Sequence, residues 1–254
     1  MPLTPARVLR TPRYAVIHDG VDDRSVIEPF TVYGWAEITI EEWIYFVHPK
    51  ASVGVVHYNV IGDNFVDRPS TLLVSDRLDY RYVACTMITK RPDGTSAVYE
   101  YLIHVPTVSN KQVHIIRRLT VGREYTVWVD GIRRYTATIP ANEKTVLEWN
   151  PDEATYPERY RRFVIGANMI STAWMTLRQG LLRIYRRGLS DDQIAWNYNN
   201  PDDPVSGELR VSLYAHPDYI QDIDGDGIPE WIDLSGHGNH GKIYGARLVE
   251  LVKE

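Results

Sequence analysis

The feature that most limits the possible folds is a series of short β-prone runs separated by turn residues. Between residues 14 and 184 most runs are rich in Val, Ile, Thr, Tyr and Trp, and Gly, Pro, Asn or Asp bounds them. Asp93-Gly94 and Asp130-Gly131 each join two such runs, and this pair favours a hairpin turn because both positions accept positive φ. We therefore predict an all-β protein, with the clearest strands at 30–40, 51–60, 81–89, 97–105, 113–119, 125–129, 133–139, 162–165 and 181–185.

One short helix is predicted at residues 190–198. Ser190 is a good N-cap, and Asp191 and Asp192 place carboxylates in the first turn, where they complement the helix dipole. The Pro-rich stretch at 150–157 predicts a long loop, and the one at 200–204 is the only candidate domain boundary. We nevertheless expect a single domain over residues 1–254, with residues 206–254 as its C-terminal segment.

Composition places the chain among ordinary folded domains and excludes several classes of function. Of its 254 residues, 44% are hydrophobic and 24% charged, and the lone Cys85 gives no disulfide framework. A net charge of −5 disfavours binding to nucleic acid or to a membrane surface. No apolar run reaches the roughly 18 residues of a membrane span, and the N-terminus lacks a signal-peptide core. An excess of Arg over Lys favours a thermophilic source.

Three segments resemble, in order, the laminin-G-like domains of the concanavalin A-like lectin/glucanase superfamily. The first carries the turn Asp-Gly-Val-Asp-Asp at residues 19–23, and the second is the hairpin in REYTVWVDGIRRYTATI. The third is FVIGAN followed by GLLRIYRRGLSDDQIAWNY. The resemblance spans most of residues 14–198 and implies an antiparallel jelly-roll β-sandwich with two sheets.

A fourth matching segment lies in an unexpected place. LYAHPDYI and WIDLSGHGNHGKIYGA, within residues 213–246, resemble a stretch that such domains carry before the first turn, yet here they close the chain. Either the domain is circularly permuted and these strands pair beside the N-terminal ones, or they complete a neighbouring subunit or begin a second domain. We favour the permuted domain, because it leaves no large exposed sheet edge.

The most specific local signal is the acidic run DIDGDGIPEWID at residues 222–233. Acids at positions 1, 3, 5, 9 and 12, with Gly at position 6, follow the spacing of EF-hand and related calcium loops. Without a cation these carboxylates would repel one another, so the alternative of a metal-free surface turn is less favoured. We predict structural Ca²⁺ as the cofactor, with ligands from Asp222, Asp224, Asp226, the Ile228 carbonyl, Glu230 and Asp233.

Other chemistry has little support in the sequence. His237 and His240 have the spacing of a zinc pair, but no third His or Cys lies near them. The glucanase branch of the superfamily implies a strand bearing Glu-x-Asp-x-Glu, and the nearest acids, Glu37, Glu41 and Glu42, have the wrong spacing. Serine-hydrolase, phosphate-loop and dinucleotide motifs are also absent. We therefore predict that the protein is not an enzyme.

Binding is the class of function that remains. Jelly-roll proteins hold sugars against aromatic rings, with Asp, Asn and backbone groups of loops in support. The candidate ligand-binding residues, in or beside expected loops, are Trp149, Tyr156, Asn168 and Trp174. The alternative is that tryptophans fill the core, namely Trp35, Trp43, Trp128 and Trp174.

Two functions from different classes fit these observations. The first is a non-catalytic, calcium-binding, lectin-like module that binds a glycan or another cell-surface ligand for adhesion. The second is a structural subunit of a virion, appendage or surface layer, assembled as a homo-oligomer or filament through its displaced C-terminal strands. Both place the protein outside the cell, on a virion or on a cell surface.

Overall fold

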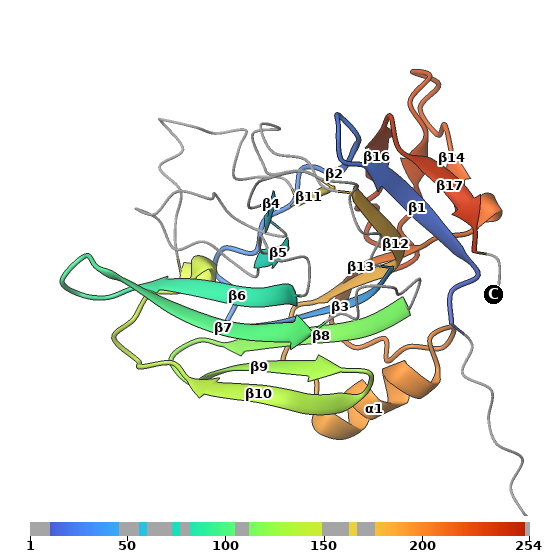
Figure 1. Cartoon of the computed structure of the whole chain (residues 1–254). Helices are drawn as coiled ribbons and strands as arrows, with labels where there is room; N and C mark the ends of the chain where they lie inside the picture. The colour runs from blue at the N-terminus through green and yellow to red at the C-terminus, as the bar shows by residue number, and fades with distance from the viewer. Residues whose placement is uncertain are drawn as a thin grey trace, which may run out of the picture.

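The chain folds as an all-β, antiparallel sandwich, as predicted, and its described residues include one α-helix (Figure 1). This computed structural model describes residues 11–45, 56–59, 73–76, 82–104, 112–148, 163–166 and 176–251. Among these residues, no helix has the length and apolar character needed to cross a membrane.

The large sheet has eight strands, and β3 lies near its centre. Its order is β10 (Ile132–Thr138), β9 (Glu124–Val129), β8 (Gln112–Thr120), β3 (Glu37–Tyr45), β12 (Thr176–Tyr185), β1 (Tyr14–Asp19) and β17 (Arg247–Glu250), with β13 (Leu209–Tyr214) also beside β12. Along one side β12 pairs with β3. Along its other side it pairs first with β1 and then with β13. The strand β12 therefore joins the C-terminal segment to the rest of the sheet.

Two smaller sheets cover one face of the large sheet. The second sheet has the order β11 (Phe163–Ile165), β2 (Arg24–Ile27), β16 (Gly241–Tyr244), β15 (Glu230–Trp231) and β14 (Ile220–Gln221). The third sheet has the order β4 (Val56–Asn59), β5 (Leu73–Asp76), β6 (Tyr82–Lys90) and β7 (Ser96–His104). One apolar core joins all three sheets, because Ile40 and Leu182 of the large sheet are buried in it together with Trp231 and Met87.

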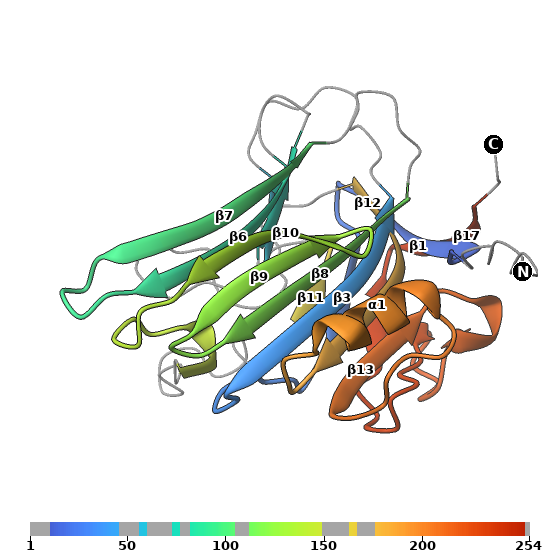
Figure 2. The ribbon, with the colours of Figure 1, turned by 90° about the horizontal axis from the view of Figure 1, so that it is seen from below.

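The α-helix α1 (Asp191–Asn199) covers the opposite face of the large sheet. Ser190 accepts a hydrogen bond from the Gln193 amide, and the Gln193 side chain accepts one from the Ser190 amide. This reciprocal cap satisfies two amides at the start of the helix. Ile194 of α1 is buried against Ile116 and Trp128 of the sheet. In Figure 2, which is seen from below, α1 lies in front of the large sheet.

A buried carboxylate connects α1 to the sheet beneath it. Glu41 on β3 is fully buried, and its oxygens lie 3.0 Å from His114 Nε2, 3.4 Å from Arg183 Nη1 and 2.7 Å from Asn197 Nδ2. Burial alone would raise the pKa of Glu41, but the charge of Arg183 and the contacts with His114 and Asn197 together lower it. The carboxylate is therefore charged, and β8, β12 and α1 all hold it.

The C-terminal segment pairs with the N-terminal strands of the same chain. In the register of β17 with β1, Glu250 lies opposite Tyr14, and in that of β16 with β2, Lys242 lies opposite Val26. Arg13, which directly precedes β1, also contacts β17, because its Nε donates a hydrogen bond to Glu250 Oε1 at 2.7 Å. The 3₁₀ helix η2 (Pro217–Tyr219) leads from β13 into β14, and a second one, η1 (Val146–Glu148), follows β10.

One predicted strand is wrong in its first half. Residues 30–40 were expected to be extended throughout, but β3 begins only at Glu37. The backbone turns at Gly34, whose φ is +79°, and its amide donates to the carbonyl of Leu147 at 2.8 Å. Local β propensity is thus overridden by a turn that packs on η1. The Asp-Gly hairpins and the helix are confirmed, whereas the Pro-rich stretch 150–157 lies outside the described residues.

The variant Glu41→Gln tests the role of the buried carboxylate. Loss of its charge leaves Arg183 buried without a counter-ion, so we expect the free energy of unfolding to fall by about 3–5 kcal/mol. Urea denaturation followed by circular dichroism at pH 7 measures this change. In the control Glu208→Gln the lost ion pair with Arg210 is partly exposed to solvent, and the loss should stay below about 1 kcal/mol. Equal losses in both variants would contradict the assignment.

The same carboxylate gives the stability a dependence on pH. The pKa of Glu41 is lower in the folded chain than its ordinary value of 4.5. Its contribution is therefore complete above the ordinary value and is lost as the pH falls through the folded pKa. Between pH 5 and pH 3, estimated as roughly the range of carboxylate titration, Glu41→Gln should lose less stability than the wild type.

Candidate functional site

The acidic run predicted from the sequence forms a tight loop between β14 and β15. The carboxylate of Asp222 accepts the amides of Gly225 at 2.9 Å and Gly227 at 3.0 Å, which turns the chain back on itself. Gly225 and Gly227 have φ values of +76° and +84°, a region that other residues enter only with strain. Carboxylate oxygens of Asp222, Asp224 and Asp226 consequently lie within 4.8 Å of one another.

An ammonium group of the protein lies on this loop. Lys242 comes from β16, where the strand register places it opposite Glu230. Its Nζ lies 2.7 Å from Asp224 Oδ2, 2.5 Å from Asp226 Oδ2 and 3.9 Å from Glu230 Oε1. These hydrogen bonds raise the pKa of Lys242, and the bond with Lys242 lowers the pKa of Asp224. A cation thus fits between these carboxylates.

The other carboxylate oxygens of the loop are occupied by loop amides. Asp224 Oδ1 accepts the amide of Asp226 at 3.2 Å, and Asp226 Oδ1 accepts the amide of Ile228 at 2.8 Å. Glu230 is buried, and its Oε2 accepts the amide of Ile223 at 2.7 Å. Three carboxylates, those of Asp224, Asp226 and Glu230, therefore lie within 4 Å of the Lys242 ammonium, and that of Asp222 lies beside the other two aspartates. Hard oxygen donors of this kind are the ligands that Ca²⁺ binds.

Asp233, the last acid of the predicted calcium set, serves a different turn. Its Oδ1 accepts the amides of Ser212 at 2.8 Å and Ser235 at 2.9 Å, and its Oδ2 accepts the amide of Asn239 at 3.0 Å. The Ser235 hydroxyl also donates to Oδ2 at 2.7 Å. The structure thus gathers the first three acids of the run, places Glu230 near Lys242, and uses Asp233 to hold the turn at 233–239 against β13.

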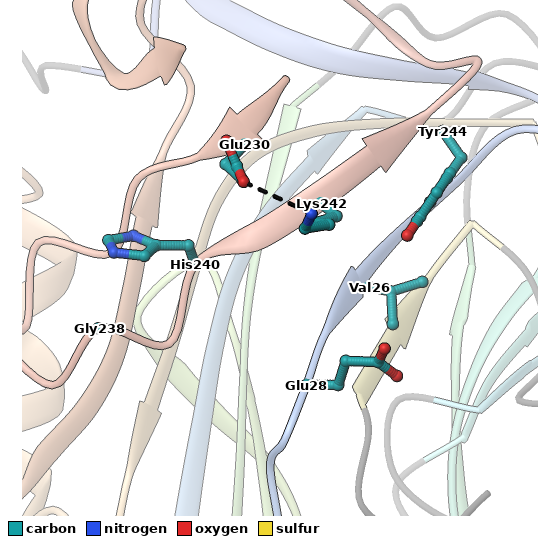
Figure 3. A pocket seen from close by; sticks show the side chains of 7 residues that line it. All are labelled: Val26, Glu28, Glu230, Gly238, His240, Lys242 and Tyr244. Carbon is teal, nitrogen blue, oxygen red and sulfur yellow. Dashed lines mark ion pairs between the residues drawn. The ribbon is translucent and has the colours of Figure 1, made fainter. Parts of the chain in front are cut away.

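A pocket of about 230 Å³ adjoins the acidic loop on the outer side of the second sheet (Figure 3). Lys242 lies in its middle, with Glu230 and His240 on one side and Glu28 and Tyr244 on the other. His240 is engaged by the neighbouring turn, because its Nδ1 accepts the amide of Asp233 at 3.0 Å. The pocket and the loop therefore share Lys242 and Glu230.

One further group of acids meets the same distance criterion, whereas the candidate zinc pair does not. In the described part of the chain, groups of three or more ligand-type side chains occur only in the acidic loop and at Asp19, Asp22 and Asp23. The latter three lie in the turn between β1 and β2, where Asp23 Oδ2 accepts the amide of Asp19 at 2.9 Å and Asp19 Oδ1 accepts the amide of Val21 at 2.7 Å. His237 belongs to neither group, and its Nε2 lies 3.4 Å from Arg210 Nη1.

Glu41 and Glu42, the adjacent acids in the cluster that most resembles a catalytic pair, point to opposite faces of the large sheet. Glu41 faces α1, whereas Glu42 faces the core, where it forms an ion pair with Arg117. Glu37 accepts the amide of Gly188 at 2.8 Å. These three acids therefore do not share a site. Cys85 is fully buried, and burial raises the pKa of its thiol well above the ordinary value, as expected for a packing residue.

An open groove of about 900 Å³ lies at the end of the large sheet where β3 begins. Tyr33 and Trp35 come from the loop at 28–36, and 47% of the Tyr33 surface is exposed. The ring of Phe30 meets Trp35 edge-on, with centroids 6.0 Å apart, and the Arg186 guanidinium lies 6.0 Å from the Trp35 ring. The other lining residues are Gly34, Ala36, Glu37, Thr120, Val121, Leu147 and Glu148.

Sequence reasoning missed this groove. The predicted ligand-binding residues Trp149, Tyr156, Asn168 and Trp174 all lie outside the described residues. Of the tryptophans that the alternative places in the core, Trp43 and Trp128 are buried, but between the large sheet and α1. Trp35 is only half-buried and lines the groove. The signal available in the sequence was the pair of aromatic residues on either side of Gly34, a residue that favours a turn.

Comparisons with known proteins support the fold alone. The sequence matches no protein-family profile and no curated protein. Among solved structures, a candidate carbohydrate-binding protein from Bacteroides ovatus has a TM-score of 0.60 and 13% identity, with 98% of this chain and 61% of that chain covered. The chain thus spans less than two thirds of that protein's length. This similarity supports the all-β sandwich fold.

Two further structures are more distant. The binding domain of botulinum neurotoxin serotype D has a TM-score of 0.49 and 12% identity, with 75% of this chain and 44% of that chain covered. A heptameric SAP-like pentraxin from Limulus polyphemus has a TM-score of 0.47 and 10% identity, with coverages of 74% and 82%. Neither is similar enough to carry an argument about this protein.

The variant Asp233→Ala tests whether Asp233 holds the turn at 233–239 or binds the metal. It removes the acceptor of several buried hydrogen bonds, so the free energy of unfolding should fall by about 2–4 kcal/mol. Because Asp233 holds the turn at 233–239, we expect the same loss in calcium and in EDTA, measured by urea denaturation. A loss that occurs only in calcium would instead make Asp233 a ligand.

Proposed function

We propose that this protein is a non-catalytic, lectin-like module that binds a glycan in the groove formed by Tyr33 and Trp35. The observation that carries the proposal is the groove itself, in which partly exposed aromatic rings adjoin the charged side chains of Arg186 and Glu148. Sugar rings present apolar C–H faces and polar hydroxyl edges, so this combination of side chains suits them. The B. ovatus protein with a similar fold is itself described as a candidate carbohydrate-binding protein.

The placement of the acids supports binding without catalysis. A glycosidase needs two carboxyl groups across one bond, and Glu41 and Glu42 lie on opposite faces of β3. A glycan-binding module of this kind would act in adhesion, outside the cell or on a virion or cell surface.

We also infer that residues 1–254 act as one domain, in which residues 206–254 complete the sandwich of their own chain. The pairing of β17 with β1 and of β16 with β2 supports this. These strands have partners without a neighbouring subunit. The chain therefore offers less support for the alternative, a structural subunit assembled through them.

The acidic loop is proposed to hold structural Ca²⁺. Asp222, Asp224, Asp226 and Glu230 would supply carboxylate oxygens, and Ile228 its backbone carbonyl. The clustering of the three aspartates and the excess of carboxylates over cations support this assignment. Bound calcium would stabilise the connection between β14 and β15.

Substitution of the groove aromatics tests the glycan proposal. The first measurement is a glycan array with calcium present, followed by titration of the best glycan. Trp35→Ala and Tyr33→Ala should each weaken binding by about fivefold, because stacking on one ring contributes about 1 kcal/mol. Trp196→Ala is the matched control, since Trp196 is an exposed aromatic residue on α1 and should leave binding unchanged. An array without hits would overturn the proposal.

Thermal unfolding with and without chelator tests the calcium proposal. At a free calcium concentration about one hundred times the Kd, binding should add about 2.7 kcal/mol to the free energy of unfolding. Calorimetry should then show a midpoint higher in calcium than in EDTA, with a smaller shift in magnesium. Asp224→Asn should reduce the difference between calcium and EDTA. An identical midpoint in both buffers would rule out the site.

A further inference from the structure

We propose that Lys242 is a built-in competitor of calcium, whose ammonium occupies the acidic loop in the metal-free protein and moves into the adjoining pocket when Ca²⁺ binds. The proposal rests on the calcium site proposed above and adds its regulation. It concerns a residue outside the acidic run, on a different strand.

The ammonium contacts the carboxylate oxygens that a metal would need. In Asp224 and Asp226, each Oδ1 already accepts a loop amide, so the Oδ2 atoms are the ones turned away from the backbone. Lys242 Nζ lies 2.7 and 2.5 Å from these two Oδ2 atoms. A cation that replaces Lys242 would therefore find a preformed pair of oxygens.

The metal and the ammonium cannot share this position. Calcium binds oxygen at about 2.3–2.6 Å, close to the distances at which the ammonium already contacts the same atoms. A divalent ion placed there would overlap Nζ and repel its charge. Binding of one cation to the Oδ2 pair therefore excludes the other.

The pocket beside the loop can accept the Lys242 ammonium when it leaves the acidic loop. The side chain of Lys242 lines this pocket of about 230 Å³, and its flexible stem lets the ammonium turn without moving β16. Glu28 lies on the far side of the pocket and offers a second carboxylate to the displaced ammonium (Figure 3). Release from the loop therefore does not leave the charge without an acidic neighbour.

Competition of this kind has two consequences. In the absence of metal, Lys242 offsets repulsion among the carboxylates and keeps the loop folded. In the presence of calcium, the ion must first displace the ammonium. The measured calcium affinity therefore equals the affinity of the empty loop multiplied by the fraction of metal-free protein in which Lys242 has left the loop.

Calorimetric titration of the whole chain with Ca²⁺ tests the proposal. Lys242→Met keeps the length of the side chain but removes its charge, and it should bind calcium at least about tenfold more tightly than the wild type, a difference of about 1.4 kcal/mol. Lys242→Arg keeps a competing cation and should stay within about threefold. Arg24→Met is the matched control, because Arg24 stacks on Tyr244 of the same sheet and should change affinity by less than about twofold. Equal or weaker binding by Lys242→Met would overturn the proposal.

Chemical labelling of the wild type provides a measurement that needs no variant. An amine-acetylating reagent should modify Lys242 several times faster in saturating calcium than in EDTA, while the exposed Lys144 reacts at the same rate in both. Mass spectrometry of the digested protein gives both rates. If calcium binds and the labelling of Lys242 does not change, only the competition is wrong. If no variant binds calcium, the calcium site itself is wrong, and the competition falls with it.

Discussion

The charged carboxylate of Glu41, held between the large sheet and the helix, is the interaction on which the rest of the arrangement depends. Its partners come from β8, β12 and α1, so one buried acid fixes two neighbouring strands and the helix that covers them. Asn197 extends the connection, because its side chain also accepts the amide of Val205 at 2.9 Å and so guides the chain from α1 into β13. The C-terminal segment, with the acidic loop and its pocket, begins from that strand.

The two candidate sites use opposite chemistry in different parts of this frame. The groove at Tyr33 and Trp35 is open and aromatic, and it lies where the loop before β3 meets η1. The acidic loop is a compact set of carboxylates, organised by its own amides and by Lys242. The first arrangement suits reversible contact with a ligand, and the second suits a cation that stabilises a connection. Neither site needs the other to form, so their proposed functions can be separated experimentally.

The sequence predicted those features whose cause is local. The hairpin at Asp130-Gly131 and the capped helix after Ser190 depend on a few adjacent residues, and so does the clustering of the first acids in the run. The groove could not be predicted, because its walls come from four distant stretches of chain. The contact of Lys242 with the loop depends on the register of β16 with β15, which the calcium motif does not contain. The motif also matched Asp233, but in the structure that carboxylate accepts the amides of another turn.

The pairing of β1 with β17 determines how the protein would respond to a pulling force. The first residue of β1, Tyr14, lies opposite the last residue of β17, Glu250, and just outside them the Leu251 amide donates to the Arg13 carbonyl. Tension applied through the two ends of the chain therefore acts at the same end of this antiparallel pair, where it opens the ladder one hydrogen bond at a time. Shear would have to break several bonds together. A module tethered at both ends would yield first at this edge, while a load entering through the groove would be carried by the interior strands.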